Sequence, residues 1–277
     1  PYFVYGNRQD GPTRRGPSNS LAGGNWHSVG GGEASWAIPD PFDSNIVWAS
    51  NEQGVLTRYD LRTGHSTNVQ VWPETPVGKS PRDLKYRWVW SYPLVASRHA
   101  PGTLYVGSQF VHKTTDGGST WREISPDLTT DDETKQVDSG GLTLDNVGVD
   151  YGTTLFAIGE SPLEPDVLWV GSNDGLIHVT RDGGDSWTNV TVNLDSLPPW
   201  GTVSNIEASR FAVGSAYVTV DLHQVDDRNP YVYRTNDFGA SWTLITNGIP
   251  RGMLSYAHVI REDPERPGML YLGTENA

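Results

Sequence analysis

The sequence predicts an all-β protein built from short antiparallel strands, and three observations carry that prediction. The pattern Thr-x-Asp-x-Gly-x-Thr/Ser-Trp occurs three times, with its aspartates at Asp116, Asp182 and Asp237. The copies stand next to short runs of alternating apolar and polar residues, an arrangement typical of β-hairpins. The chain also has 31 Gly, 19 Pro and 11 Trp but only 36% hydrophobic residues, a mixture that suits many short strands and turns.

Each residue type in the repeated pattern has a role in folding. The aspartate can accept hydrogen bonds from backbone N–H groups of its own turn, and the glycine can take a positive φ where a Cβ would clash. The Ser/Thr hydroxyl is a second local hydrogen-bonding group, and the tryptophan buries a large apolar area at the start of the next strand. We therefore favour a structural role over a row of metal-binding or catalytic aspartates. The residues concerned are Asp116, Gly118, Trp121, Asp182, Gly184, Trp187, Asp237, Gly239 and Trp242.

The three copies resemble the Asp-box (bacterial neuraminidase) repeat, which in known families caps the outer hairpin of a β-propeller blade. The flanking text is similar to the sortilin-like propellers of large secreted bacterial proteins described as glycosyl hydrolase-like. The likeness extends from about Val47 onward and includes Leu-Tyr/Trp-Val/Leu-Gly at residues 104–107, 168–171 and 270–273. It implies a β-propeller of four-stranded antiparallel blades. It does not imply one activity, because sialidases, xyloglucanases, receptors and assembly factors all carry the repeat.

The spacing of the strand signatures predicts a single propeller region over residues 1–277. Repeat lengths of roughly 40 to 65 residues fit propeller blades with insertions. Because no leader precedes Pro1 and the chain stops after a strand signature, we expect a fragment of a larger, extracellular or periplasmic propeller protein. The expected blades are a partial blade at 1–33, blades at about 34–72, 88–128, 151–194 and 200–249, and a partial blade at 255–277.

Composition excludes several classes of function. The net charge of −13 argues against a nucleic-acid partner, which would require a basic surface. The longest charge-free apolar stretch, residues 211–220, is too short to span a bilayer, so no membrane insertion is expected. The chain has no cysteine, which excludes a disulfide scaffold and thiol catalysis.

Two acidic loops are predicted on the face opposite the repeated turns. One covers residues 127–150 and carries seven acidic residues against Lys135, and the other covers residues 221–230 with Asp221 and His223. We favour solvated loops that keep an acidic protein soluble. The alternative is a calcium site, because hard cations prefer clustered carboxylate and carbonyl oxygens, although no EF-hand spacing occurs. No other cofactor or metal is expected.

Aromatic residues near the expected starts of the innermost strands predict a ligand site. Aromatic rings beside carboxylates and amides suit sugar stacking or a bound peptide, whereas packing between blades is the alternative for any one ring. The predicted ligand-binding residues are Trp88, Trp90, Tyr151, Trp200, Asp221 and His223.

Three functions follow from these observations. We favour a binding module of a secreted protein that engages peptide or glycan on the face opposite the Asp boxes. The first alternative is a sialidase- or xyloglucanase-like glycoside hydrolase, which needs two facing carboxylates roughly 5 to 9.5 Å apart. The second is a structural protein that closes against the rest of the same larger protein or a partner subunit. Candidate carboxylates are Glu52, Asp150, Asp174, Glu207 and Asp221, from which the sequence selects no catalytic pair. For Arg98, Arg210 and Arg261, blade-to-blade ion pairs are favoured over a substrate clamp.

Overall fold

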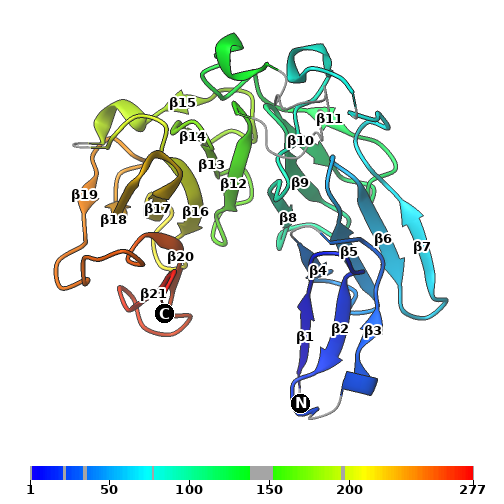
Figure 1. The fold of residues 1–277 in the computed structure, drawn as a ribbon. Helices are drawn as coiled ribbons and strands as arrows, with labels where there is room; N and C mark the ends of the chain where they lie inside the picture. Colours follow the sequence, from blue (N-terminus) through cyan, green and yellow to red (C-terminus); the bar gives the residue numbers. More distant parts are fainter. Residues whose placement is uncertain are drawn as a thin grey trace. The chain divides into compact units, whose positions relative to one another are not determined.

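The computed structural model describes residues 2–20, 23–33, 36–76, 78–137, 152–194 and 197–276. In these ranges the chain forms six antiparallel sheets (Figure 1), which confirms the predicted all-β class. Tyr151 and Asp150 from the predicted sites lie outside the described residues. The helices of the described ranges are short 3-10 segments, and none is long and apolar enough to cross a membrane.

The chain divides into two compact units. The first holds the described residues up to Glu123 together with residues 133–137, and it contains three sheets. Within each sheet, strands that are neighbours in the chain pair with one another. The first sheet consists of β1 (Phe3–Gly6), β2 (Arg14–Pro17) and β3 (His27–Ser28). The second consists of β4 (Ala37–Pro39), β5 (Ile46–Ser50), β6 (Leu56–Asp60) and β7 (His65–Asn68). The third consists of β8 (Leu94–Ala96), β9 (Leu104–Gly107), β10 (Val111–Thr114) and β11 (Arg122–Glu123).

The second unit holds residues 124–132 and the described residues from 152 onward. It also contains three sheets, which follow the same consecutive strand order. Its first sheet consists of β12 (Leu155–Glu160), β13 (Leu168–Ser172), β14 (Ile177–Thr180) and β15 (Thr188–Asn189). The next consists of β16 (Thr202–Ala208), β17 (Ala216–Leu222), β18 (Asp227–Thr235) and β19 (Thr243–Leu244). The last is the hairpin of β20 (Ala257–Glu262) and β21 (Leu270–Thr274).

The second strand of each four-stranded sheet is the most deeply buried. Every residue of β5, β9 and β13 is buried. Such strands are covered on both faces, and they read as continuous apolar runs such as Ile46-Val47-Trp48-Ala49. The outer strands β11 and β15 are short and exposed. The strand order and burial together have the form of propeller blades.

The core of the second unit lies between its sheets. Trp169 of β13 is fully buried and meets the ring of Trp242 edge-on, with centroids 6.1 Å apart. Gly171 allows β13 to approach β16 closely, because a Cβ at that position would lie 2.2 Å from Val203 on β16. A second cluster joins Tyr217 and Val232 to Ala257 and Ile260 of the terminal hairpin.

Two segments with the composition of loops are partly strands. Residues 10–20 are rich in Gly, Pro and Arg, but they include β2, which pairs with β1 in register from Phe3 to Gly6. The acidic loop at 221–230 is reduced to a tight turn, because Leu222 pairs with Asp227 and extends the β17–β18 hairpin. Asp226 closes this turn at φ +63°, a conformation that aspartate tolerates.

Candidate functional site

The three repeated turns share one hydrogen-bond pattern. The backbone N–H and the hydroxyl of Thr120 donate to Asp116 at 2.9 and 2.7 Å, and the Thr114 hydroxyl donates to Asp116 Oδ1 at 2.8 Å. The backbone N–H of Gly118 donates to Thr114 Oγ1 at 3.0 Å. The same bonds recur around Asp182, with Thr180 and Ser186, and around Asp237, with Thr235 and Ser241. Each carboxylate is therefore engaged within its own hairpin turn.

These bonds also fix the charge of the aspartates. The hydroxyl and then the backbone N–H of Thr120 hold the pKa of Asp116 at about 2. Ser186 does the same for Asp182, whose pKa is also about 2, and Ser241 lowers the pKa of Asp237. The three groups are thus ionised at neutral pH, and none is suited to donate a proton as a general acid.

The tryptophan and glycine of each turn pack against a residue that directly follows an outer strand in the chain. Trp121 Nε1 donates to the carbonyl of Val69 at 2.8 Å. A Cβ added to Gly118 would lie 2.6 Å from the same valine. Trp187 and Gly184 contact Ile124 in this way, and Trp242 and Gly239 contact Val190. Within the first unit Trp121 thereby joins sheet β8–β11 to sheet β4–β7, and within the second unit Trp242 joins sheet β16–β19 to sheet β12–β15.

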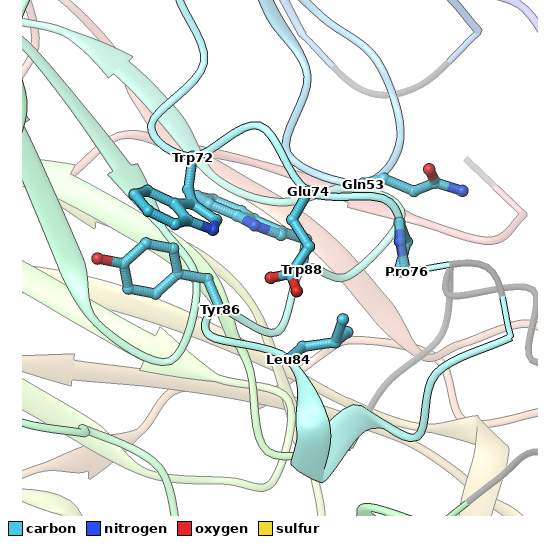
Figure 2. Close-up of a pocket in the computed structure, with 7 residues that line it drawn as sticks. All are labelled: Gln53, Trp72, Glu74, Pro76, Leu84, Tyr86 and Trp88. Carbon is cyan, nitrogen blue, oxygen red and sulfur yellow. The ribbon is translucent and has the colours of Figure 1, made fainter.

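An aromatic pocket lies in the first unit, at the end of sheet β4–β7 away from the β6–β7 turn. Figure 2 shows the side chains that line it, which include Trp88 of the predicted set. Its free volume is about 10 Å³, roughly the space for one water, so a ligand would bind mainly across its mouth. There Trp72 is 45% exposed. The lining residues are Gln53, Trp72, Glu74, Pro76, Leu84, Tyr86 and Trp88.

Buried rings form the base of this pocket. Tyr86 meets Trp88 edge-on at 6.2 Å, and Trp88 meets Tyr92 at 5.1 Å. Gly54 has φ +75° and permits close contact with Trp88, because a Cβ there would lie 2.5 Å from the indole. His112 lies 4.6 Å from Tyr86, and burial lowers its pKa to about 3. The base is therefore uncharged and rigidly packed.

The charged groups around the pocket contact either each other or its aromatic rings. Glu74 Oε1 accepts a hydrogen bond from Lys79 Nζ at 2.7 Å, and its Oε2 accepts one from the backbone N–H of Lys85 at 3.3 Å. The Lys85 ammonium lies 3.9 Å from the ring centroid of Trp72. Among the lining residues that the structure describes, Glu74 is the only carboxylate. The pocket thus offers aromatic surface and one neutralised carboxylate.

Asp221 and His223 belong to a second cluster, in the other unit. His223 Nδ1 lies 2.8 Å from both Asp221 oxygens, and its ring stacks on Tyr256 with centroids 4.6 Å apart. His258 Nε2 lies 2.9 Å from Glu275, and its Nδ1 lies 3.8 Å from Asp221. The cluster links the β17–β18 hairpin to the terminal hairpin. Among the described residues, no group of three or more His, Asp or Glu is placed to hold a metal ion.

Two of the other predicted rings, Trp90 and Trp200, are half-buried. Trp200 lies in the turn before β16 at φ +65°. Neither of them lines the aromatic pocket. Tyr151 is outside the described residues.

The carboxylates considered for glycoside hydrolysis lie in separate local environments. Asp174 accepts hydrogen bonds from the Ser172 hydroxyl and from the backbone N–H of Thr130. Glu207 lies 3.5 Å from Arg261 on β20, and burial raises the pKa of Glu207. Glu52 has a buried Oε2 without a hydrogen-bond partner in the part of the chain that the structure describes.

The arginines from the sequence analysis have different positions. Arg261 lies within β20 and forms an ion pair between neighbouring sheets, and Arg210 donates its backbone N–H to Glu262.

Sequence reasoning missed Trp72, Glu74 and Tyr86. They lie in or beside the Pro-rich stretch at residues 73–81, which contains none of the predicted ligand-binding residues. The available signal was local: Trp72 and Tyr86 flank that stretch and Glu74 lies within it, and a spacer would not need large rings.

No family model and no curated protein matches this chain. Solved structures do match it. An ancestral GH74 enzyme is similar with a TM-score of 0.61 and 16% identity, covering 90% of this chain and 30% of the enzyme. The GH74 xyloglucanase from Xanthomonas campestris is similar with a TM-score of 0.60 and 16% identity, and the match covers 98% of this chain and 40% of the xyloglucanase. The computationally designed protein Ika8 is similar with a TM-score of 0.53 and 12% identity, and the match covers 98% of this chain and 65% of Ika8.

The fold is that of β-propeller blades. These identities are too low to carry more than the fold. The chain spans less than half the length of the two GH74 proteins.

Proposed function

We propose that this chain is a glycan-binding propeller region of a larger secreted protein, with its ligand at the aromatic pocket around Trp72. The carrying observation is an exposed indole backed by buried Tyr86 and Trp88. Aromatic faces beside a few fixed polar groups suit sugar rings, and Gln53 and Glu74 supply such groups here. The fold likeness to a xyloglucanase supports a glucan as the first ligand to test.

The turns around Asp116, Asp182 and Asp237 are Asp boxes in this proposal. The β6–β7 turn occupies the corresponding place in sheet β4–β7, and Gln53 lies in the β5–β6 loop at the other end of that sheet. The pocket is therefore on the side away from the Asp-box turns, where a propeller ligand was expected. This placement supports the binding role.

Binding is favoured over hydrolysis by the number of carboxylates. A glycoside hydrolase needs two, facing each other across the scissile bond. The described lining of the pocket includes one carboxylate, Glu74, and Lys79 neutralises it at 2.7 Å. A peptide ligand would use the same rings and is separated from a glycan by the test below.

The test is titration calorimetry of the whole chain with xyloglucan, cello- and manno-oligosaccharides. We expect Trp72→Ala to weaken the best ligand about tenfold, because stacking on an exposed ring is lost. Phe211→Ala is the matched control, since Phe211 is 40% exposed in the other unit, and it should leave affinity unchanged. No binding by any oligosaccharide, or equal binding by Trp72→Ala, would overturn the proposal. So would preference for a peptide library.

A glycoside hydrolase is the second candidate, and the likeness to GH74 enzymes favours it. Glu207 has the raised pKa that suits a general acid. Release of reducing ends from xyloglucan by the wild type, lost in Glu207→Gln but not in Trp72→Ala, would support catalysis at a separate site. No release by the wild type would rule it out.

A further inference from the structure

A second groove lies in the first unit, between sheet β4–β7 and the loops of sheet β8–β11. Its volume is about 440 Å³, within the range of small-molecule sites. Trp48, Arg58 and Thr67 form a row across one face of the sheet, because each is paired with the next in the strand register. Pro101, Gly102 and the turn at Asp116 form the opposite wall. The groove thus lies near the repeated turns, at the other end of the sheet from the aromatic pocket.

The loop that edges the groove is held in shape before any ligand arrives. Asp40 Oδ1 accepts the backbone N–H groups of Phe42 and Asp43 at 2.8 and 2.9 Å. Asp40 Oδ2 accepts the indole N–H of Trp48 at 3.1 Å. The ring of Phe42 remains 51% exposed at the rim. An exposed aromatic ring on a fixed loop loses little conformational entropy when it stacks on a ligand.

Arg58 is the free donor of the groove. Its guanidinium lies 5.8 Å from the Trp48 ring centroid and makes no hydrogen bond or ion pair with the described residues. The carboxylates around it already accept bonds from the protein: Asp116 from Thr120, and Asp43 from Asn45 and Arg62. Their remaining lone pairs can accept further hydrogen bonds, while Arg58 offers several donors.

This combination selects the ligand's chemistry. A cationic group would be repelled by Arg58, and an anionic group by Asp40, Asp43 and Asp116. A neutral polyhydroxylated ring satisfies both kinds of group, since each hydroxyl donates and accepts, and its apolar face can stack on Phe42. We propose that this groove is a second saccharide site for a neutral sugar unit, independent of the aromatic pocket.

The test uses the indole N–H signals of the whole chain in ¹⁵N–¹H NMR, titrated with cellotetraose. Trp48 reports on the groove and Trp72 on the aromatic pocket. We expect both signals to shift. Arg58→Met keeps an apolar side chain over Trp48 but removes the donors, and it should weaken the Trp48-reported affinity about tenfold. Phe42→Ala should also weaken it, while the Trp72-reported affinity stays the same.

The control is Arg234→Met, because Arg234 lies at a similar distance, 6.0 Å, over Tyr217 in the other unit. It should change neither signal. An unshifted Trp48 signal, or equal affinity in Arg58→Met, would overturn the groove proposal even if Trp72 responds. Preferential shifts of Trp48 with tetragalacturonate, with a cationic chitosan oligomer or with a neutral peptide would overturn the assignment to a neutral sugar. A Trp48 response without one at Trp72 would support the groove and count against the proposed pocket.

Discussion

At the scale of single residues, one glycine controls how closely a repeated turn approaches the neighbouring sheet, at the residue that follows β7. Gly118 has φ +84°, and a Cβ there would lie 2.6 Å from Val69. Gly248 has the same φ with nothing within 4 Å of its Cβ position. Both Ala variants should lose about 1 kcal/mol to backbone strain. Gly118→Ala should lose about 1 to 3 kcal/mol more from overpacking. Urea unfolding measures the difference, and equal losses would contradict the steric account.

Two buried histidines make the protein sensitive to mild acid. His112 and His178 occupy corresponding positions in β10 and β14, and burial lowers their pKa values to about 3 and about 4 from 6.5. The unfolded chain therefore binds these protons at higher pH than the folded chain does. Folding stability should fall as pH drops below about 6.5, and this loss should continue until the folded-state pKa values are reached.

The double variant His112→Leu, His178→Leu isolates this effect. The slope of unfolding free energy against pH between 4 and 6.5 should become shallower, whatever the variant's stability at pH 7. Denaturant unfolding at several pH values measures the slope. An unchanged slope would show that other groups cause the acid sensitivity.

At the scale of elements, the repeated turns depend on an ionised aspartate. The folded pKa of Asp116 is about 2, below the ordinary 3.8, because Thr120 donates two hydrogen bonds to the carboxylate. A depressed carboxylate pKa stabilises the fold above the unfolded value, and that stabilisation is lost as pH falls through the folded value. Stability from this turn should therefore disappear between about pH 4 and pH 2.

Asp116→Asn should remove this contribution at neutral pH and flatten the acid limb of the stability curve. Hydrogen exchange of the Thr120 amide gives a local reading, since its N–H donates to Asp116. We expect faster amide exchange at Thr120 than in the wild type. Amide exchange at Ser186, the equivalent residue of the second repeated turn, should change much less. Unaltered exchange at Thr120 would mean that the carboxylate does not hold the turn.

The turns were predictable from sequence because their bonds are local. Thr114, Asp116 and Thr120 form hydrogen bonds with residues only two or four positions away. The motif alone therefore determines the geometry of the turn. The aromatic pocket was not predictable in the same way. Gln53, Trp72 and Tyr86 come from separate segments whose meeting depends on how β5–β6 packs against the chain before β8. Only Trp88 was anticipated there, and β2 and the first residues of β18, 227–230, were missed because their polar residues resemble loops.

At the scale of the whole molecule, the net charge of −13 sets the response to salt. Excess charge of one sign destabilises a compact state through self-repulsion. Raising ionic strength from 0.01 to 0.15 M shortens the screening length from roughly 30 to about 8 Å. The melting temperature should therefore rise over this range of NaCl, as differential scanning calorimetry can show. A lower melting temperature would mean that attractive pairs such as Lys79–Glu74 outweigh the repulsion.

The indole of Trp121, bonded to the Val69 carbonyl, limits where foreign peptides can be grafted onto this scaffold. An insertion between Asp116 and Trp121 would change the number of residues between the turn and the indole. Trp121 could then no longer reach the Val69 carbonyl, and the two neighbouring sheets would lose this contact. Gly248 differs, because a Cβ at that position would have nothing within 4 Å. We expect a tag inserted at Gly248 to leave the packing of the sheets intact, whereas the same tag in the Asp116 turn would break the bond between Trp121 and Val69.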